Sequence, residues 1–205
     1  MKRGKLIALE GIDGSGTTTQ ARLLFRALKE HGHQVQMTSE PSRGPVGRLV
    51  RAYLQGNHQF ADARLGASGL ALLFAADRVE HLCREINPRL AAGRLVVTDR
   101  YLLSSLAYQS LGCDPAWVES INRNAPRPDL TLLLDLPVPI ALKRVSQRGV
   151  ERDLFEKLNL QKRIRKNYLR LARSPKYRKG MVVVNAAASI KKVSEDILNS
   201  VLERI

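Results

Sequence analysis

Cysteine, long apolar runs and acidic residues are all scarce in this sequence. Two cysteines, Cys83 and Cys113, occur in 205 residues, with no Cys-x-x-Cys spacing and no pair of histidines nearby. These features indicate neither a disulfide framework nor a zinc site, and they favour a reducing, cytoplasmic setting. No apolar run approaches the roughly 20 residues that a membrane helix requires, and residues 6–9 are too short for a signal-peptide core. We therefore expect a cytoplasmic protein without a membrane partner.

The shortage of acidic residues leaves a large positive charge. Lys and Arg number 34 against 19 Asp and Glu, which gives a formal net charge of +15. Such an excess suits nucleic acid, an anionic membrane or a phosphorylated small molecule, or else it forms a solvated surface. With 44% hydrophobic and 26% charged residues, the composition is that of a soluble globular protein. The length fits one domain over residues 1–205.

Five short apolar segments, each expected to be a strand, alternate with helical patterns. The expected strands are residues 5–10, 34–38, 94–98, 130–136 and 181–184. The expected helices are residues 17–30, 45–55, 63–90, 101–110, 115–124, 137–147, 153–172 and 190–205. Strands that are apolar throughout are buried on both faces, which predicts an α/β fold with a parallel sheet covered by helices on each side. Ligands of such sheets bind beyond the carboxyl ends of the strands.

A glycine-rich turn follows the first strand. Residues 11–18 match the phosphate-binding pattern G-x-x-x-x-G-K-[ST], except that Thr17 replaces the lysine. Glycines let the backbone aim its N–H groups at phosphate oxygens, the next helix adds its positive dipole end, and Thr18 offers a hydroxyl to Mg²⁺. The alternative is a tight strand–helix turn without a ligand. The missing lysine normally bridges the β- and γ-phosphates, and a threonine brings no charge.

Polar residues also follow the second and third strands. Asp99 comes directly after an apolar strand, where a carboxylate suits the water shell of Mg²⁺, and Arg100 suits a phosphate. The next helix carries hydroxyls and an amide in two adjacent rows along its surface. These side chains either recognise a base or sugar or are ordinary polar residues. These residues are Ser104, Ser105, Tyr108 and Gln109. After the second strand, Glu40 opens a loop that leads to Arg51 and is either functional or plain surface.

Two further clusters leave more than one interpretation open. Phe74 and Arg78 lie one helical turn apart, so Phe74 stacks on a base or packs in the core. Arg78 grips a ligand or forms a solvated pair with Asp77, and His81 is interpreted as a structural hydrogen-bonding residue. The basic residues between 143 and 166 form a flap over a triphosphate or a face for nucleic acid.

Together these motifs resemble the thymidylate kinases, which are P-loop nucleoside-monophosphate kinases, over nearly the whole chain. The matching segments are EGIDGSG at 10–16, SEP at 39–41, LLFAADRVEHL at 72–82, DRYLLSSLAYQ at 99–109 and RPDLTLLLDLP at 127–137. The resemblance implies a P-loop NTPase-type three-layer α/β/α fold with a five-stranded parallel sheet and a short helical lid at about residues 144–160. It also implies dTMP and ATP as substrates, Mg²⁺ as the metal, a homodimer, and no nucleic-acid partner.

The resemblance further implies roles for individual residues. The ATP phosphates are expected at Gly11, Ile12, Asp13, Gly14, Ser15, Gly16, Thr17 and Thr18. The dTMP-binding residues are expected to be Asp13, Glu40, Arg51, Phe74, Arg78, Arg100, Ser104, Ser105, Tyr108 and Gln109, with thymine at Phe74 and Arg78 and the phosphate at Arg51 and Arg100. Thr18 and Asp99 are expected to hold the metal, with Glu40 near it. Asp13, Arg100 and the lid arginines Arg144, Arg148 and Arg152 are expected to be catalytic, the lid arginines because position 15 is Ser rather than Arg.

These expectations lead to one favoured activity and three alternatives. The favoured activity is in-line transfer of the γ-phosphoryl group of Mg-ATP to dTMP, with lid cations replacing the absent lysine. The alternatives are a degenerate or weakly active homologue that still binds nucleotide, a non-enzymatic binder of nucleotide or nucleic acid, and a kinase for another pyrimidine monophosphate.

Overall fold

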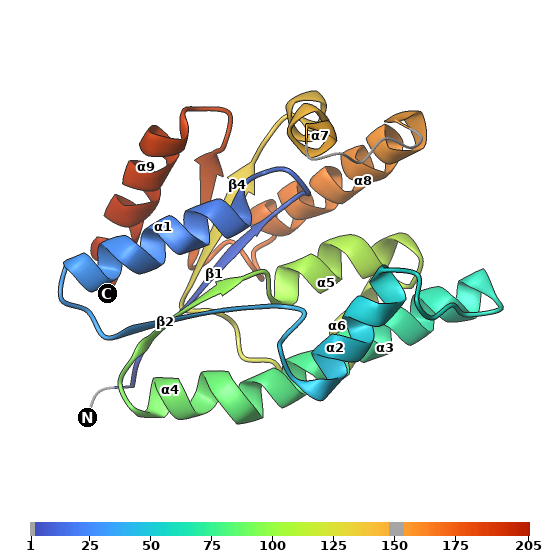
Figure 1. Cartoon of the computed structure of the whole chain (residues 1–205), viewed down its shortest axis with the longest axis horizontal. Helices are drawn as coiled ribbons and strands as arrows, with labels where there is room; N and C mark the ends of the chain where they lie inside the picture. The colour runs from blue at the N-terminus through green and yellow to red at the C-terminus, as the bar shows by residue number, and fades with distance from the viewer. Residues whose placement is uncertain (1–2, 148–153) are drawn as a thin grey trace.

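The computed structural model describes residues 3–147 and 154–205, which are arranged around a five-stranded sheet (Figure 1). The strands are β1 Leu6–Gly11, β2 Val35–Ser39, β3 Leu95–Asp99, β4 Leu130–Asp135 and β5 Met181–Asn185. They lie in the order β2-β3-β1-β4-β5, and every neighbouring pair is parallel. The predicted α/β fold with a five-stranded parallel sheet is confirmed, and each strand ends within one residue of its predicted bounds.

Helices cover both faces of the sheet (Figure 1). On one face, α1 (Thr17–Glu30) packs against α9 (Ile190–Leu202). On the other face lie α4 (Asn87–Ala91), α5 (Leu102–Tyr108) and α8 (Leu154–Arg173). The remaining α-helices of the described residues are α2 (Pro45–Leu54), α3 (Ala63–His81), α6 (Pro115–Ile121) and α7 (Val138–Ser146).

The central strands are buried along their whole length and mostly apolar because helices cover both of their faces. Every residue of β1 and of β3 is buried, whereas the edge strand β2 is half-buried throughout. Ile7 and Leu9 of β1 have no exposed surface, and Leu24 and Leu28 of α1 pack into the same core. Removing this apolar surface from water is the main stabilising contribution to the sheet.

The helix predicted over residues 63–90 is interrupted. After α3 the chain makes one wide π-type turn at Leu82–Ile86, in which the Asn87 N–H bonds to the Leu82 carbonyl five residues earlier. Pro88 then lies in the first turn of α4, where its missing N–H is tolerated. The wide turn lets the chain continue past the proline, so the prediction of one regular helix is wrong at this point.

The register of the sheet brings the predicted motifs to one edge. Leu9 of β1 and Ser39 of β2 are both paired with Asp99 of β3, and Gly11 is paired with Leu134 of β4. The loops that follow β1, β2 and β3 therefore begin side by side, at the carboxyl ends where parallel sheets bind their ligands.

Within the described residues, no helix combines the length and the apolar character needed to cross a membrane.

Candidate active site

The predicted phosphate loop forms a tight turn between β1 and α1. Gly14 and Gly16 have φ angles of 83° and 96°, in the left-handed region that favours glycine. A Cβ on Gly14 would lie 2.4 Å from the carbonyl oxygen of Ala141, so a side chain has no room there. Gly16 is the N-cap of α1, and no side chain among the described residues caps the first turn. The loop thus leaves backbone donors at the positive end of a 14-residue helix, as phosphate binding requires.

Thr18 and Asp99, the two predicted metal-binding residues, meet beside this turn. The Thr18 hydroxyl donates to Asp99 Oδ2. The other carboxylate oxygen, Oδ1, is buried and has no hydrogen-bond partner among the described residues. A buried carboxylate oxygen without a donor suits a cation or a metal-bound water, so this pair fits the Mg²⁺ that the family resemblance implies.

Thr17 occupies the position where the phosphate-loop pattern has lysine. It is the first residue of α1 and is 6% exposed. Its short neutral side chain adds no positive charge to the loop, which also carries the carboxylate of Asp13. The loop therefore presents oriented backbone donors but lacks the side-chain cation that normally reaches the β- and γ-phosphates.

A pocket of about 420 Å³ opens between the phosphate loop, α7 and the start of α9. Gly14 and Gly16 line it from the loop, and Arg144 lines it from α7. Arg144 Nη2 donates to the carbonyl of Ala186 at 3.2 Å, which is also part of the lining. The volume suits a nucleotide. The other two predicted lid arginines, Arg148 and Arg152, lie outside the described residues.

Arg100 lies between the phosphate loop and α5. Its φ of 69° makes it the one non-glycine residue with a positive φ in the described ranges. Nη1 donates to the Gly11 carbonyl at 3.1 Å and to Ser104 Oγ at 3.3 Å, and Nη2 donates to Asp13 Oδ1 at 2.6 Å. One guanidinium thus contacts both the predicted donor loop and the predicted acceptor pocket.

Asp13 is the point where the phosphate loop, α5 and α8 converge. Tyr108 donates its hydroxyl to Asp13 Oδ1 at 3.1 Å, and its ring centre lies 5.1 Å from the Arg100 guanidinium carbon. Gln161 of α8, which sequence reasoning missed, donates to Asp13 Oδ2 at 3.0 Å. Its own Oε1 is buried and has no partner among the described residues. Burial raises the pKa of Tyr108, so its hydroxyl stays a donor at neutral pH.

Glu10 is a buried carboxylate next to the turn that carries Arg100, and the sequence motifs predict no role for it. Oε2 accepts from the hydroxyls of Ser104 at 2.6 Å and Tyr168 at 3.1 Å, and Oε1 accepts from the Tyr101 N–H at 3.1 Å. Burial raises the pKa of Glu10, and the hydrogen bond from Ser104 and the charge of Arg100 oppose that shift. The signal in the sequence is a charged residue at the end of an otherwise apolar strand.

Arg78 is 1% exposed, and protein groups bind its whole guanidinium. It donates to Glu40 Oε2 from Nε at 3.0 Å and from Nη2 at 2.6 Å. Nη2 also reaches Ser105 Oγ at 3.1 Å and the Tyr101 carbonyl at 3.0 Å, while Nη1 donates to Asn122. The predicted residues Glu40, Arg78 and Ser105 therefore form one connected network.

The side chain of Glu40 belongs to this network. Its Oε1 lies 3.3 Å from His81 Nδ1, and only its backbone N–H contacts the carbonyl of Asp99, at 3.0 Å. Buried nitrogens of Arg78 and His81 thus hold the Glu40 carboxylate, and the expectation that Glu40 lies near the metal stays a prediction. His81 Nε2 also lies 2.7 Å from Thr38 Oγ1, which confirms its interpretation as a structural hydrogen-bonding residue.

Arg51 of α2 is held by the loop that follows β2. Nη1 donates to the carbonyls of Pro41 and Ser42, and Nη2 donates to Ser42 again, each at 2.7 Å. Ser42 in turn donates its N–H to Asp77 Oδ2 at 2.8 Å and its hydroxyl to Oδ1 at 2.5 Å. Asp77 has no exposed surface, which excludes the alternative of a solvated pair with Arg78. Burial raises the pKa of Asp77.

Phe74 and Gln109 have fewer contacts. Phe74 is half-buried, and it lies outside the hydrophobic core formed by the described residues, which favours a stacking surface over core packing. Gln109 is half-buried in a short 3₁₀ turn, Gln109–Leu111, that continues α5.

Comparison with known proteins places the whole chain in a family. The family model for thymidylate kinase matches residues 9–197. The chain belongs to the thymidylate kinase family. It is 47% identical over 197 residues to a probable thymidylate kinase of Pyrococcus abyssi, with 96% of this chain and 95% of that protein covered. It is 43% identical over 198 residues to that of Pyrococcus horikoshii, with 96% and 95% covered, and 45% identical over 197 residues to that of Thermococcus onnurineus, with 94% of each covered. Membership of the family confirms the resemblance that the sequence motifs indicated.

Proposed function

We propose that the chain transfers the γ-phosphoryl group of Mg-ATP to dTMP, giving dTDP and ADP. The observation that carries the proposal is the position of Arg100, which contacts Gly11 and Asp13 of the phosphate loop and Ser104 of the α5 pocket. A cation at this junction suits an acceptor phosphate that lies against the γ-phosphate of the donor. The names of the relatives support the same activity.

In the proposed reaction, an oxygen of the dTMP phosphate attacks the γ-phosphorus in line. The new O–P bond forms as the bond to the β,γ-bridging oxygen breaks, and ADP leaves with the electron pair of that bond. The attacking oxygen is already anionic, so no strong general base is required. Bound Mg²⁺ supplies charge neutralisation at the phosphates, and Thr18 and Asp99 are the residues that would hold it.

The acceptor side of the proposed site divides into three parts. Arg51 and Arg100 bind the dTMP phosphate, and Asp13 orients the sugar. Tyr108 packs against the sugar and disfavours ribose. The remaining residues either surround the base or hold in place the residues that surround it. They are Phe74, Arg78, Ser105, Ser104, Gln109 and Glu40. Of these residues, Arg78 already contacts Glu40 and Ser105 in one buried network.

On the donor side, we propose that lid arginines supply the charge that Thr17 does not. Arg144 lines the pocket next to the phosphate loop, and Arg148 and Arg152 are proposed to join it. A cation near the transferring group stabilises the charge that develops there. The activity is then that of a working enzyme rather than of a degenerate nucleotide binder.

Coupled measurement of ADP release with dTMP, dUMP, dGMP and UMP as acceptors tests the proposal. We expect the highest kcat/KM with dTMP. A higher value with dUMP would assign the chain to another pyrimidine monophosphate. No acceptor-dependent ADP release from either the native chain or a Thr17→Lys variant would contradict the kinase activity, and salt-sensitive DNA binding in its place would support the nucleic-acid binder.

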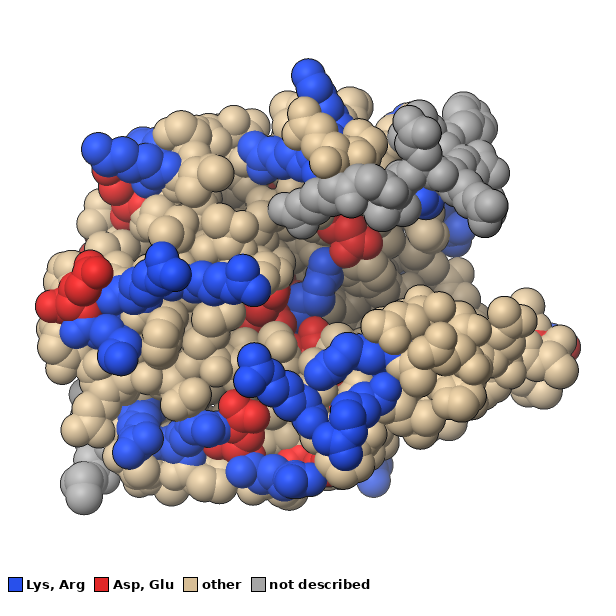
Figure 2. Space-filling model, in the orientation of Figure 1, with Lys and Arg blue, Asp and Glu red and all other residues tan. Residues whose placement is uncertain are grey.

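We also propose a homodimer that forms through the outer face of α3. Leu65, Leu72 and Val79 recur every seven residues on this helix and are 70%, 49% and 45% exposed. In Figure 2 the surface over the start of α3 carries few charged residues, unlike the neighbouring surface over α2 and the surface over α1. An exposed apolar stripe of this kind suits a second copy of the chain. Sedimentation velocity is expected to give twice the mass of the chain, and a monomer would contradict the dimer.

A further inference from the structure

Two buried carboxylates, Glu10 and Asp77, have no part in the proposed reaction. Glu10 is 1% exposed and Asp77 has no exposed surface. Burying a carboxylate costs free energy unless hydrogen bonds replace its water. Each of these carboxylates accepts from a serine hydroxyl and from a backbone N–H, and Glu10 accepts from the Tyr168 hydroxyl as well. Each serine also contacts one of the two arginines that are proposed to bind the acceptor phosphate.

Glu10 accepts hydrogen bonds from two residues that follow Arg100, Tyr101 and Ser104. Oε1 accepts from the N–H of Tyr101, the residue directly after the arginine, at 3.1 Å. Oε2 accepts from the hydroxyl of Ser104 at 2.6 Å, and Ser104 Oγ in turn accepts from Arg100 Nη1 at 3.3 Å. Arg100 has a φ of 69°, and a residue in that conformation persists only where its surroundings fix it. Glu10 contributes to this constraint through Tyr101 and Ser104, together with the Leu9 carbonyl, which accepts from the Arg100 N–H at 2.9 Å, and the Thr98 hydroxyl, which donates to the Arg100 carbonyl at 2.8 Å.

Asp77 holds the loop that binds Arg51, as Glu10 holds the turn that carries Arg100. It accepts from both the N–H and the hydroxyl of Ser42, at 2.8 and 2.5 Å. The carbonyl of Ser42 then accepts from both terminal nitrogens of Arg51, at 2.7 Å each. Asp77 fixes the plane of the Ser42 loop, so the carbonyls that receive the Arg51 guanidinium are fixed as well.

We propose that Glu10 and Asp77 are positioning residues that set Arg100 and Arg51 in place for the acceptor phosphate before dTMP binds. The two chains of contacts have the same order, from carboxylate to serine to arginine. Donors that are already oriented lose less conformational freedom when the ligand arrives, so the acceptor is bound more tightly. This inference rests on the proposed function, in which both arginines bind the dTMP phosphate.

The test compares steady-state kinetics of the native chain with Glu10→Gln and Asp77→Asn. Each variant keeps the shape of the side chain and replaces one acceptor oxygen with a donor. We expect kcat/KM for dTMP to fall about 10-fold in each, because hydrogen bonds to a charged group are lost, while KM for ATP stays within about 2-fold. A merely structural role would change the parameters of both substrates together.

Asp129→Asn is the matched control. The Asp129 carboxylate also accepts from a backbone N–H, that of Leu6 at 2.8 Å, but at the opposite end of β1. We expect this variant to keep the native parameters for both substrates. If thermal unfolding shows that Asp77→Asn does not fold, Ser42→Ala removes a single hydroxyl from the same chain of contacts, and Ser42→Thr is expected to restore it.

Each outcome decides between the inference and the proposed function. Unchanged kcat/KM for dTMP in folded Glu10→Gln and Asp77→Asn would overturn the inference and leave the kinase activity in place. An equal loss for ATP, or an equal loss in Asp129→Asn, would overturn it too. No dTMP-dependent ADP release from the native chain would overturn the proposed function and the inference with it.

Discussion

The acceptor and donor halves of the site are built differently. On the acceptor side, carboxylates, hydroxyls and backbone carbonyls already hold Arg51, Arg78 and Arg100 in place. On the donor side, the loop has Thr17 in the lysine position, and Arg144 of α7 is the one cation lining the pocket within the described residues. Positive charge is therefore fixed where dTMP is proposed to bind, whereas the charge for ATP comes from outside the loop.

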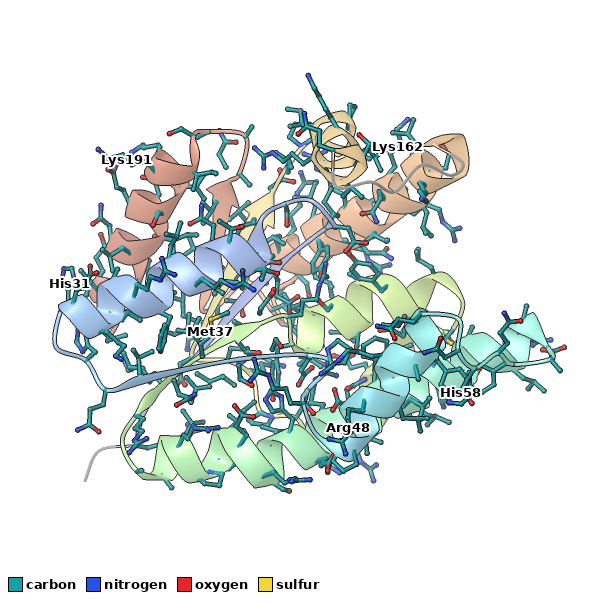
Figure 3. All side chains as sticks on the ribbon, in the orientation of Figure 1. His31, Met37, Arg48, His58, Lys162 and Lys191 are labelled. Carbon is teal, nitrogen blue, oxygen red and sulfur yellow. The ribbon has the colours of Figure 1, made fainter. Side chains whose placement is uncertain are left out.

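The arginines of the two halves of the site account for part of the net charge of +15, and the basic run 162–166 contributes to the rest. Arg165, the fourth residue of the basic run 162–166, is paired with Asp135 at 2.7 and 2.9 Å. Lys162, which Figure 3 labels on α8, is exposed, as are Arg163 and Lys166. These three are the solvated face of a helix. Nucleic acid is not needed to explain the charge, because the proposed substrates carry several negative charges themselves.

The largest expected effect is on the acceptor side, from Arg100→Ala. Because this guanidinium touches both halves of the site, we expect kcat/KM for dTMP to fall about 10³-fold. ADP release in the coupled assay measures it, with Arg163→Ala as a control arginine that is exposed on α8. A loss below about 10-fold would mean that Arg100 does not stabilise the transferring group.

The next effect is on the donor side, from Thr17→Lys. Restoring the loop cation is expected to raise kcat about 10-fold or more and to leave KM for dTMP unchanged. Thr19→Lys places the same charge two residues further along α1, in the lining of the pocket, and is the matched control. If Thr17→Lys has no effect on kcat, the other cations of the site already compensate fully for the lysine.

The variant Arg144→Ala tests the separation of the donor and acceptor halves by removing a cation from the donor half. This arginine lines only the pocket on the donor side, so KM for ATP is expected to rise about 10-fold while KM for dTMP does not change. The exposed neighbour Lys143 supplies the control variant, Lys143→Ala. A rise in both KM values would show that Arg144 serves the site as a whole.

The smallest effect concerns pH. Burial raises the pKa of Glu10, against the hydrogen bonds of Ser104 and Tyr168 and the charges of Arg100 and Arg78. A raised pKa means that the carboxylate is protonated, and its hold on Arg100 weakens, at a pH above the ordinary range of a glutamate. The ratio of kcat/KM between the native chain and Glu10→Gln is therefore expected to shrink a few-fold on acidification from neutral pH. Parallel pH profiles of the two proteins would contradict this.

The contribution of Glu10 to the stability of the fold changes with pH in the opposite direction to its effect on kcat/KM. Because the folded state binds a proton at Glu10 more readily than the unfolded state does, this contribution to stability is present at low pH and is lost as the pH rises through the raised pKa. In thermal unfolding, the melting temperature of Glu10→Gln relative to that of the native chain is expected to increase as the pH rises toward neutral.

The sequence predicts the sheet and the meeting of Thr18 with Asp99 because both follow from local patterns. Apolar runs mark buried strands, and parallel strands bring their carboxyl ends to one edge. The π-type turn before Pro88 was missed, since the same apolar spacing continues on both sides of it. The partners of the arginines were missed for another reason. Gln161 contacts Asp13 across 148 positions, and Asp77 reaches Ser42 across 35, so only the packed structure brings them together.

The central claim, that the acceptor half is set without the donor half, is tested most directly by titration calorimetry of dTMP in the absence of any ATP. The native chain and Thr17→Lys are expected to bind dTMP with Kd values within about 2-fold of each other, and Glu10→Gln is expected to bind about 10-fold more weakly. Native affinity in Glu10→Gln together with a large change in Thr17→Lys would contradict the account.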